Sequence, residues 1–175
     1  VVENLRKSGV VVVVSAGNDG AACNTLRHVP AIYEGSFSVG AFHPDNHISN
    51  FSSNGPVNNY KEVRIKPNVV APGSDVLSTL PDGQFASWNG TSMAGPHVAG
   101  LVALMISANP LLAGRVETIE TIIEETAEPF VADFDCFPYS GTRIPNNTYG
   151  YGLINALKAV EKAKLYVGVV ESNFS

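Results

Sequence analysis

The chain has 175 residues, of which 45% are hydrophobic and 15% are charged. This length suits one domain with a substantial core, and the hydrophobic share excludes a disordered protein. The low charge excludes a coiled coil, and a net charge of −5 gives no electrostatic reason to bind nucleic acid or an anionic membrane. The longest apolar stretch, Val98 to Ile106, has roughly half of the ~20 residues that a bilayer span needs, so we expect no membrane span.

The first half of the chain predicts strands separated by turns. Residues 1–8 are typical of the end of a helix, and the unbroken valine run in residues 9–14 predicts a strand buried on both faces of a parallel sheet. The run ends in a turn-rich segment, residues 15–20, at the strand end where α/β sheets build their sites. Residues 36–42 predict a second apolar strand.

Three shorter strands are predicted next, at residues 69–71, 75–80 and 84–88. The last two are separated by Pro-Asp-Gly, which favours a tight turn and therefore a hairpin.

The second half of the chain is predominantly helical. Residues 91–108 are apolar nearly all round, which predicts a buried helix, and residues 115–126 show the periodicity of an amphipathic helix. A loop is expected over residues 128–148 and another helix over residues 154–166. These predicted strands and helices together indicate an α/β domain, and the sequence has no internal repeat.

The densest chemical signal is the segment 89–100, which reads Asn-Gly-Thr-Ser-Met-Ala-Gly-Pro-His-Val-Ala-Gly. Ser92 lies where a glycine-containing turn enters the predicted helix, so the free N–H groups of the helix face its hydroxyl and any anion formed there. Taken alone, a serine at a helix start is far more often an N-cap than a nucleophile. The segment also differs from the G-x-S-x-G elbow of the α/β-hydrolases, because Ala94 replaces the second glycine.

The combination of segments changes this interpretation. Residues 90–100 closely resemble the nucleophile signature of the subtilisin-like serine proteases, the subtilases, and residues 15–18 resemble the oxyanion-hole segment of that family. Further blocks match in the family's order, at residues 38–41, 51–56, 66–73 and 150–156. The resemblance spans roughly residues 1–160 and lies nearest the bacillopeptidase F-like branch.

This resemblance implies a partial subtilisin-like α/β fold, with a mainly parallel sheet flanked by helices and a buried helix following the nucleophile. Residues 1–166 would form the C-terminal half of a catalytic domain, and residues 167–175 a tail or linker. The chain opens at Val1 and not at Met, so it is either a processed precursor or a piece of a longer protein, and the motifs favour a piece of a longer protein.

The resemblance also implies roles for individual residues. Ser92 would attack the scissile carbonyl, and the Asn18 side-chain amide would join the Ser92 backbone N–H in stabilising the oxyanion. Asn18 alone, before Asp-Gly, would be better explained as a turn-stabilising residue. The pocket for the residue before the cut bond would have Ser15, Ala16 and Gly17 as one wall, and Asn89 and Thr91 would flank the nucleophile.

The chain departs from the family in lacking its other two catalytic blocks. A subtilase orders its triad as Asp, His and Ser, and nothing before residue 18 matches the first two. His97 follows Ser92 by five residues and would point some 140° away on the helix, as a packing residue. His28, His43 and His47 lie in loop-like segments with no family role. The chain alone should therefore lack full activity.

The expected partners are a peptide or protein substrate and the missing N-terminal half of the domain. Without that half, an open sheet edge and an apolar face should favour self-association. No cofactor is required for the chemistry; a structural calcium ion is conceivable at the carbonyls of residues 31–36, but no acidic cluster indicates one. The family suggests an extracellular or cell-envelope location.

Two alternatives to the peptidase come from other functional classes. A pseudoprotease would keep the fold for binding, although Ser92 and Asn18 argue against it. An unrelated doubly wound binding domain is disfavoured, because no G-x-G-x-x-G follows a strand.

The two cysteines leave their own question open. Cys23 and Cys136 are either unpaired buried thiols or a disulfide that closes a long loop, as in exported proteins.

Overall fold

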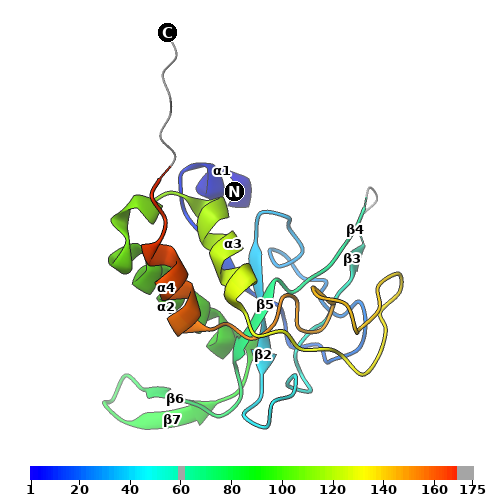
Figure 1. The fold of residues 1–175 in the computed structure, drawn as a ribbon. Helices are drawn as coiled ribbons and strands as arrows, with labels where there is room; N and C mark the ends of the chain where they lie inside the picture. The colour runs from blue at the N-terminus through cyan, green and yellow to red at the C-terminus, as the bar shows by residue number, and fades with distance from the viewer. Residues whose placement is uncertain (59–61, 169–175) are drawn as a thin grey trace.

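The computed structural model describes residues 1–58 and 62–168. Its centre is a parallel sheet of three strands in the order β1 (Val13–Ser15), β2 (Phe37–Phe42) and β5 (Val69–Pro72). The helices lie on one side of this sheet, and long loops cover the other side (Figure 1). The helices are α1 (Val2–Lys7), α2 (Thr91–Ala108), α3 (Val116–Thr126) and α4 (Ala156–Lys164), with a 3-10 turn η1 (Pro110–Leu112). Two antiparallel pairs complete the described elements: β3 (Val57–Asn58) with β4 (Val63–Arg64), and β6 (Val76–Thr79) with β7 (Phe85–Trp88).

Strand β2 is the middle of the sheet and is buried along its whole length. Phe37, Val39 and Ala41 pack into the core beneath the helices, whereas Phe42 belongs to a separate cluster with Tyr149 under the loops. A strand covered on both faces needs apolar residues at every position, which explains the lack of alternation in residues 36–42. The predicted strand and the predicted α/β class are confirmed.

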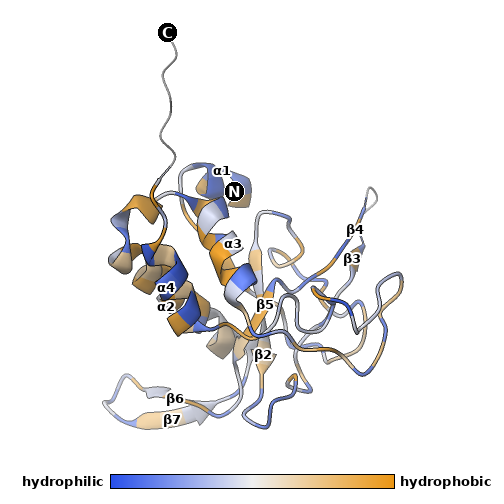
Figure 2. Ribbon diagram, in the orientation of Figure 1, coloured by the Kyte–Doolittle hydropathy of each residue, from blue (hydrophilic) through white to orange (hydrophobic). Residues whose placement is uncertain are grey.

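The helical layer forms because each helix has an apolar side. Figure 2 shows α3 and α4 alternating between hydrophobic and hydrophilic residues, as amphipathic helices do. Helix α3 buries Ile119, Ile122 and Ile123, as its periodicity predicts. Helix α4 is shorter than the predicted 154–166, because the Asn155 side chain accepts a hydrogen bond from the Lys158 N–H and so caps a helix that starts at Ala156. The β6–β7 hairpin also forms as predicted, and the tail prediction beyond residue 168 lies outside the described residues.

The expectation of a first strand buried on both faces is wrong for this structure. Only Val13–Ser15 of the valine run forms a strand, its residues are half-buried, and Val10 is 46% exposed. The reason is position: β1 lies at the edge of the described sheet, with β2 as its only described neighbour. Burial depends on the layer that covers a strand, and in the described part of the chain the outer side of β1 has none.

Helix α2 has the predicted bounds but is buried on one side only. Ala94, Val98, Leu101 and Met105 are buried against the sheet and the other helices, whereas Leu104 is 56% exposed. The outer face also exposes small residues at positions 99, 100 and 103. By length and composition alone α2 could cross a bilayer, but it contacts all three strands of the sheet, as core helices do.

A buried lysine lies at the amino ends of β2 and β5. Lys66 is 4% exposed, and its ammonium donates hydrogen bonds to the Ser36 carbonyl oxygen and to Asn68 Oδ1. The carbonyls of residues 31–36 include that of Ser36, where the sequence leaves room for a calcium ion. In the structure the Lys66 ammonium supplies positive charge at the Ser36 carbonyl oxygen. Desolvation lowers the pKa of Lys66 to about 8; nearby Arg64 and Arg6 lower it too, while Glu120 and Glu124 on α3 oppose them.

This depressed pKa predicts that stability rises with pH in an alkaline window. Between about pH 8 and 10.5 the unfolded chain binds a proton at Lys66 that the folded chain has released, so the free energy of unfolding increases by roughly 3 kcal/mol across that window. In Lys66→Met this contribution is absent. Urea unfolding of both proteins at several pH values measures the free energy of unfolding of each. The wild-type value minus the Lys66→Met value should rise from pH 8 to 10.5, and a value that stays constant or falls contradicts the prediction.

Candidate active site

Three loops meet at the carboxyl end of the sheet. The chain leaves β1 at Ser15, leaves β5 at Pro72, and returns from β7 into α2 through Gly90. The Gly90 N–H donates to the Gly73 carbonyl oxygen at 2.8 Å, which joins the last two loops. Gly73 has to be a glycine, because a Cβ there would lie 2.5 Å from the Ala41 Cβ. The close approach of these backbones fixes where α2 begins.

Ser92 is the second residue of α2 and is exposed. It lines a hollow of about 400 Å³ that it shares with the β6–β7 hairpin, including Leu77 and Trp88, and with Met93 and His97 on its own helix. The Ser92 hydroxyl is therefore accessible from this hollow.

Asn18 is bonded to the residue that precedes Ser92. Its Oδ1 accepts hydrogen bonds from both the N–H and the Oγ1 hydroxyl of Thr91, each at 3.0 Å. Thr91 Oγ1 in turn accepts the Gly17 N–H at 3.2 Å. Two donors on Oδ1 fix the orientation of the amide and leave its Nδ2 group for another acceptor.

Two N–H donors border one small space beside Gly90. A Cβ built on Gly90 would lie 3.7 Å from Asn18 Nδ2 and also 3.7 Å from the Ser92 backbone nitrogen. Neither donor has an acceptor within the part of the chain that the structure describes. Because residue 90 is glycine, no Cβ fills this space, which Met93 Sδ also borders at 3.4 Å from the same position, and an oxygen atom of a bound molecule can approach both donors there. Donors arranged in this way suit an oxygen that gains negative charge.

The remaining predicted site residues lie around this centre. Ser15 is half-buried next to α2, with its Oγ 3.7 Å from where a Gly95 Cβ would lie. Ala16 is fully buried and packs with Leu26. Asn89 is exposed, and its Oδ1 accepts the Asp75 N–H at 2.6 Å. The structure thus brings Gly17, Asn18, Thr91 and Ser92 into one group, with Ser15 beside it, while Ala16 and Asn89 bond elsewhere.

Ser53 is a site residue that the sequence analysis missed. It is fully buried; its N–H donates to the Gly17 carbonyl oxygen and its Oγ accepts the Asp19 N–H, both at 3.0 Å. These two bonds hold the residues on either side of Asn18. The block 51–56 was noted for its resemblance, but no spacing in the sequence shows that Ser53 contacts a loop 34 residues earlier.

The described histidines do not supply a base and its orienting carboxylate at Ser92. His97 was expected to be a packing residue, but it is exposed, lines the Ser92 hollow and contacts the Met93 carbonyl oxygen through Nδ1. His28 pairs with Asp19 at 2.6 Å and His43 with Asp45 at 2.7 Å, and none of these residues lines that hollow. The hydrogen bond from His28, with one from Arg27, lowers the pKa of the Asp19 carboxyl.

The family model described as the subtilase family matches residues 2–152. The chain belongs to the subtilase family. It is 39% identical to bacillopeptidase F of Bacillus subtilis (strain 168) over 160 residues, which are 91% of this chain and 10% of that protein. It is 35% identical to a subtilisin of Bacillus pumilus over 162 residues, 92% of this chain and 50% of that protein, and 34% identical to pyrolysin of Pyrococcus furiosus over 195 residues, 95% of this chain and 14% of that protein.

This subtilase chain therefore spans half or less of the length of these curated relatives. The resemblance stated from the motifs, including the likeness to bacillopeptidase F, is confirmed. Subtilases are serine peptidases, which places the family's chemistry at a serine hydroxyl.

The bonds of Ser53 predict a local effect of its replacement. Ser53→Ala leaves the Asp19 N–H without its acceptor, so we expect faster amide exchange at Asp19 and a loss of about 1–3 kcal/mol in stability. Ser52→Ala is the matched control, because Ser52 Oγ makes a similar buried bond to the Ala41 N–H on β2. Hydrogen–deuterium exchange should show acceleration at Asp19 only in Ser53→Ala; equal exchange in both variants contradicts the prediction.

Proposed function

We propose that the protein containing this chain is a serine endopeptidase that cleaves peptide bonds by acyl transfer. Ser92 is the nucleophile, and Asn18 Nδ2 with the Ser92 N–H binds the oxyanion. The observation that carries this proposal is the pair of free donors around the Gly90 space, one attached to the exposed serine itself. Substrate would lie across the end of β1, with Ser15, Ala16 and Gly17 forming one wall of the pocket and Asn89 and Thr91 flanking the nucleophile.

A serine hydroxyl needs a general base that is itself oriented by a third group. The described histidines do not provide this pair in the Ser92 hollow. The base and its carboxylate would therefore come from the N-terminal half of the catalytic domain, outside this chain, and the chain alone would be inactive. The proposed chemistry needs no cofactor, and a structural calcium ion would stabilise the fold without taking part in the reaction.

Two uncovered surfaces among the described residues support the proposal that this half docks against the chain. On its outer side β1 has no neighbouring strand in the described sheet, and the outer face of α2 exposes Leu104 among small residues about two turns beyond the Ser92 hollow. A layer docked there would bury these apolar groups and bring its own side chains to Ser92. In the absence of that layer, we propose that the same surfaces mediate self-association.

An extracellular or cell-envelope location is part of the proposal. It is supported by the disulfide between Cys23 and Cys136. Of the two alternatives that the sequence leaves open for these cysteines, the structure has the disulfide and not two unpaired thiols. Such a bond forms and persists in oxidising surroundings.

The proposed roles of Ser92 and Asn18 predict different effects of replacing each residue. In the longest natural form of the protein, Ser92→Ala should lose labelling by a fluorophosphonate, because an activated serine hydroxyl has to attack the phosphorus of the probe and displace its fluoride. Asn18→Ala should keep the nucleophile but lower kcat by about 10²–10³, the loss associated with oxyanion donors in this family. Asn50→Ala, an exposed asparagine outside the hollow, is the control. Equal labelling of wild type and Ser92→Ala would exclude Ser92 as nucleophile, and an unlabelled wild type would favour the pseudoprotease.

The uncovered faces predict association of the 175-residue chain in isolation. Size-exclusion chromatography should show dimers or larger species, and Leu104→Glu should shift them toward monomer by placing a charge on the α2 face. Leu157→Glu, at an exposed position of α4, should leave the distribution unchanged. A wild-type monomer with cooperative thermal unfolding would contradict this prediction.

A further inference from the structure

The segment that carries Asn18 has no regular secondary structure from residue 16 to residue 27. Its shape depends on individual contacts. Thr25 Oγ1 lies 2.7 Å from the Gly20 carbonyl oxygen and 2.8 Å from that of Ala22, and its single hydroxyl hydrogen is shared between these two acceptors within the segment. Irregular backbone of this kind has no ladder of hydrogen bonds to resist displacement, so its outside contacts decide where Asn18 lies.

The neighbouring strip of residues 51–55 supplies most of those contacts. Asn54 is fully buried; its Nδ2 donates to the Ala21 carbonyl oxygen at 2.6 Å, and its N–H donates to Thr25 Oγ1 at 2.9 Å. Leu26 and Asn24 donate their N–H groups to the carbonyl oxygens of Asn54 and Gly55. The strip thus holds the Asn18 segment along residues 20–26.

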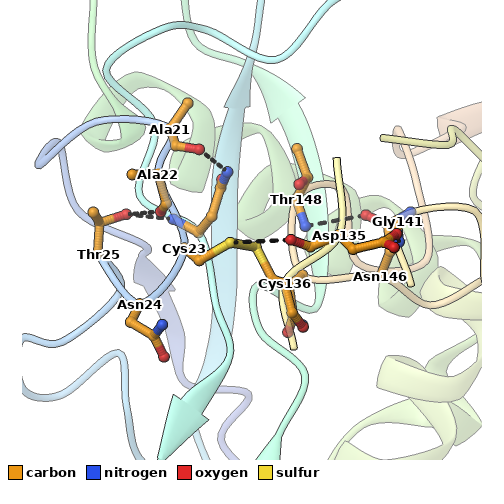
Figure 3. Close-up of a disulfide and its surroundings, with 12 residues drawn as sticks. Ala21, Ala22, Cys23, Asn24, Thr25, Asp135, Cys136, Gly141, Asn146 and Thr148 are labelled. Atoms are coloured by element: carbon orange, nitrogen blue, oxygen red, sulfur yellow. Dashed lines mark hydrogen bonds between the residues drawn. A yellow bond between two sulfur atoms is a disulfide. The ribbon is translucent and has the colours of Figure 1, made fainter. Parts of the chain in front are cut away.

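The Asn18 segment and the strip of residues 51–55 form two layers, and the loop that contains Cys136 forms a third layer behind the strip. Asn147 Nδ2 donates to the Cys136 carbonyl oxygen, and the Asn147 carbonyl oxygen accepts the Gly55 N–H at 2.9 Å. Asp135 steadies the same loop by accepting hydrogen bonds from Ser140 and Gly141. Figure 3 shows Cys23, from the Asn18 segment, bonded to Cys136 from this loop, with the Asp135 carbonyl oxygen beside the Cys23 sulfur.

The noncovalent contacts between these layers are incomplete. Asn54 Oδ1 and Asn147 Oδ1 are both buried, and neither has a hydrogen-bond partner among the described residues. A buried acceptor without a partner costs free energy that contact with water would restore, so these two oxygens weaken the noncovalent attachment of the interface. The disulfide spans the same interface and prevents the two outer layers from separating, although their cysteines are 113 residues apart in the chain.

We propose that the Cys23–Cys136 disulfide positions Asn18 for catalysis, beyond any general stabilisation of the fold. The crosslink holds the residues just after Asn18 against the Asn54 strip, while Ser53 holds the residues on either side of Asn18. The cysteines are positioning residues that act through the amide, five residues before Cys23. This inference rests on the proposed function, because it concerns the same oxyanion site.

Kinetics separate this role from that of a general staple. A staple raises the free energy of unfolding and leaves kcat of the folded enzyme unchanged. A positioning element lowers kcat when it is removed, because an oxyanion donor displaced by a fraction of an ångström stabilises the transition state less. Its effect must also disappear when the donor itself is absent.

The experiment is a double-mutant cycle in the longest natural form of the protein, with a peptide substrate and below the unfolding temperature of every variant. Cys23→Ser/Cys136→Ser should lower kcat about ten- to a hundredfold with little change in KM. In the Asn18→Ala background the same pair should cause no further loss. Ile123→Ala, buried in α3 on the other side of the sheet, is the control for lost stability and should keep the wild-type kcat.

Hydrogen–deuterium exchange gives a second readout that does not depend on activity. Amides of residues 19–26 should exchange faster in the cysteine double variant and unchanged in Ile123→Ala. An unaltered kcat in the cysteine variant, an equal loss in the Asn18→Ala background, or unaltered exchange at residues 19–26 overturns the inference. A wild-type kcat in Asn18→Ala instead overturns the proposed oxyanion role, and the exchange result then still decides whether the disulfide holds the segment.

Discussion

The site depends on the two hydrogen bonds that Thr91 donates to Asn18 Oδ1. They join the end of β1 to the start of α2 across 73 residues of chain and occupy the acceptor side of the amide. The donor side is thereby left facing the space beside Gly90, next to the Ser92 N–H. Helix α2 can present Thr91 there because Ala94 and Val98, one and two turns further on, are fully buried against the sheet. Burial of Ala94 and Val98 thus fixes the start of the helix, the position of Ser92 and, through Thr91, the orientation of the Asn18 amide.

The core that fixes α2 from one side leaves its other side open. The first two turns of the helix line the hollow through Ser92, Met93 and His97, so Ser92 lies at the margin between the packed core and the exposed outer face of α2. Under the proposed function, this arrangement would hold Ser92 and the two N–H donors beside Gly90 in place, while the general base and its carboxylate would come from another part of the protein.

The two faces of the sheet are stabilised by different means. Beneath the helices the core is apolar, whereas beneath the loops Ser52, Ser53 and Asn54 are fully buried and bond to backbone groups. Irregular backbone cannot satisfy its own N–H and C=O groups, so buried side chains have to do it. Where they fall short, as at Asn54 Oδ1 and Asn147 Oδ1, the disulfide crosses the interface.

The sequence by itself determined what is encoded locally. The unbroken apolar run predicts β2, the 3.6-residue period predicts α3, Pro-Asp-Gly predicts the β6–β7 hairpin, and the motif around Ser92 indicates the family. Only the tertiary structure decided the half-burial of β1 and α2, the hydrogen bonds of Ser53 to Gly17 and Asp19, and the pairing of the cysteines. Periodicity and turn chemistry act over a few neighbouring residues, whereas burial and contacts between loops depend on which distant segments the fold places alongside.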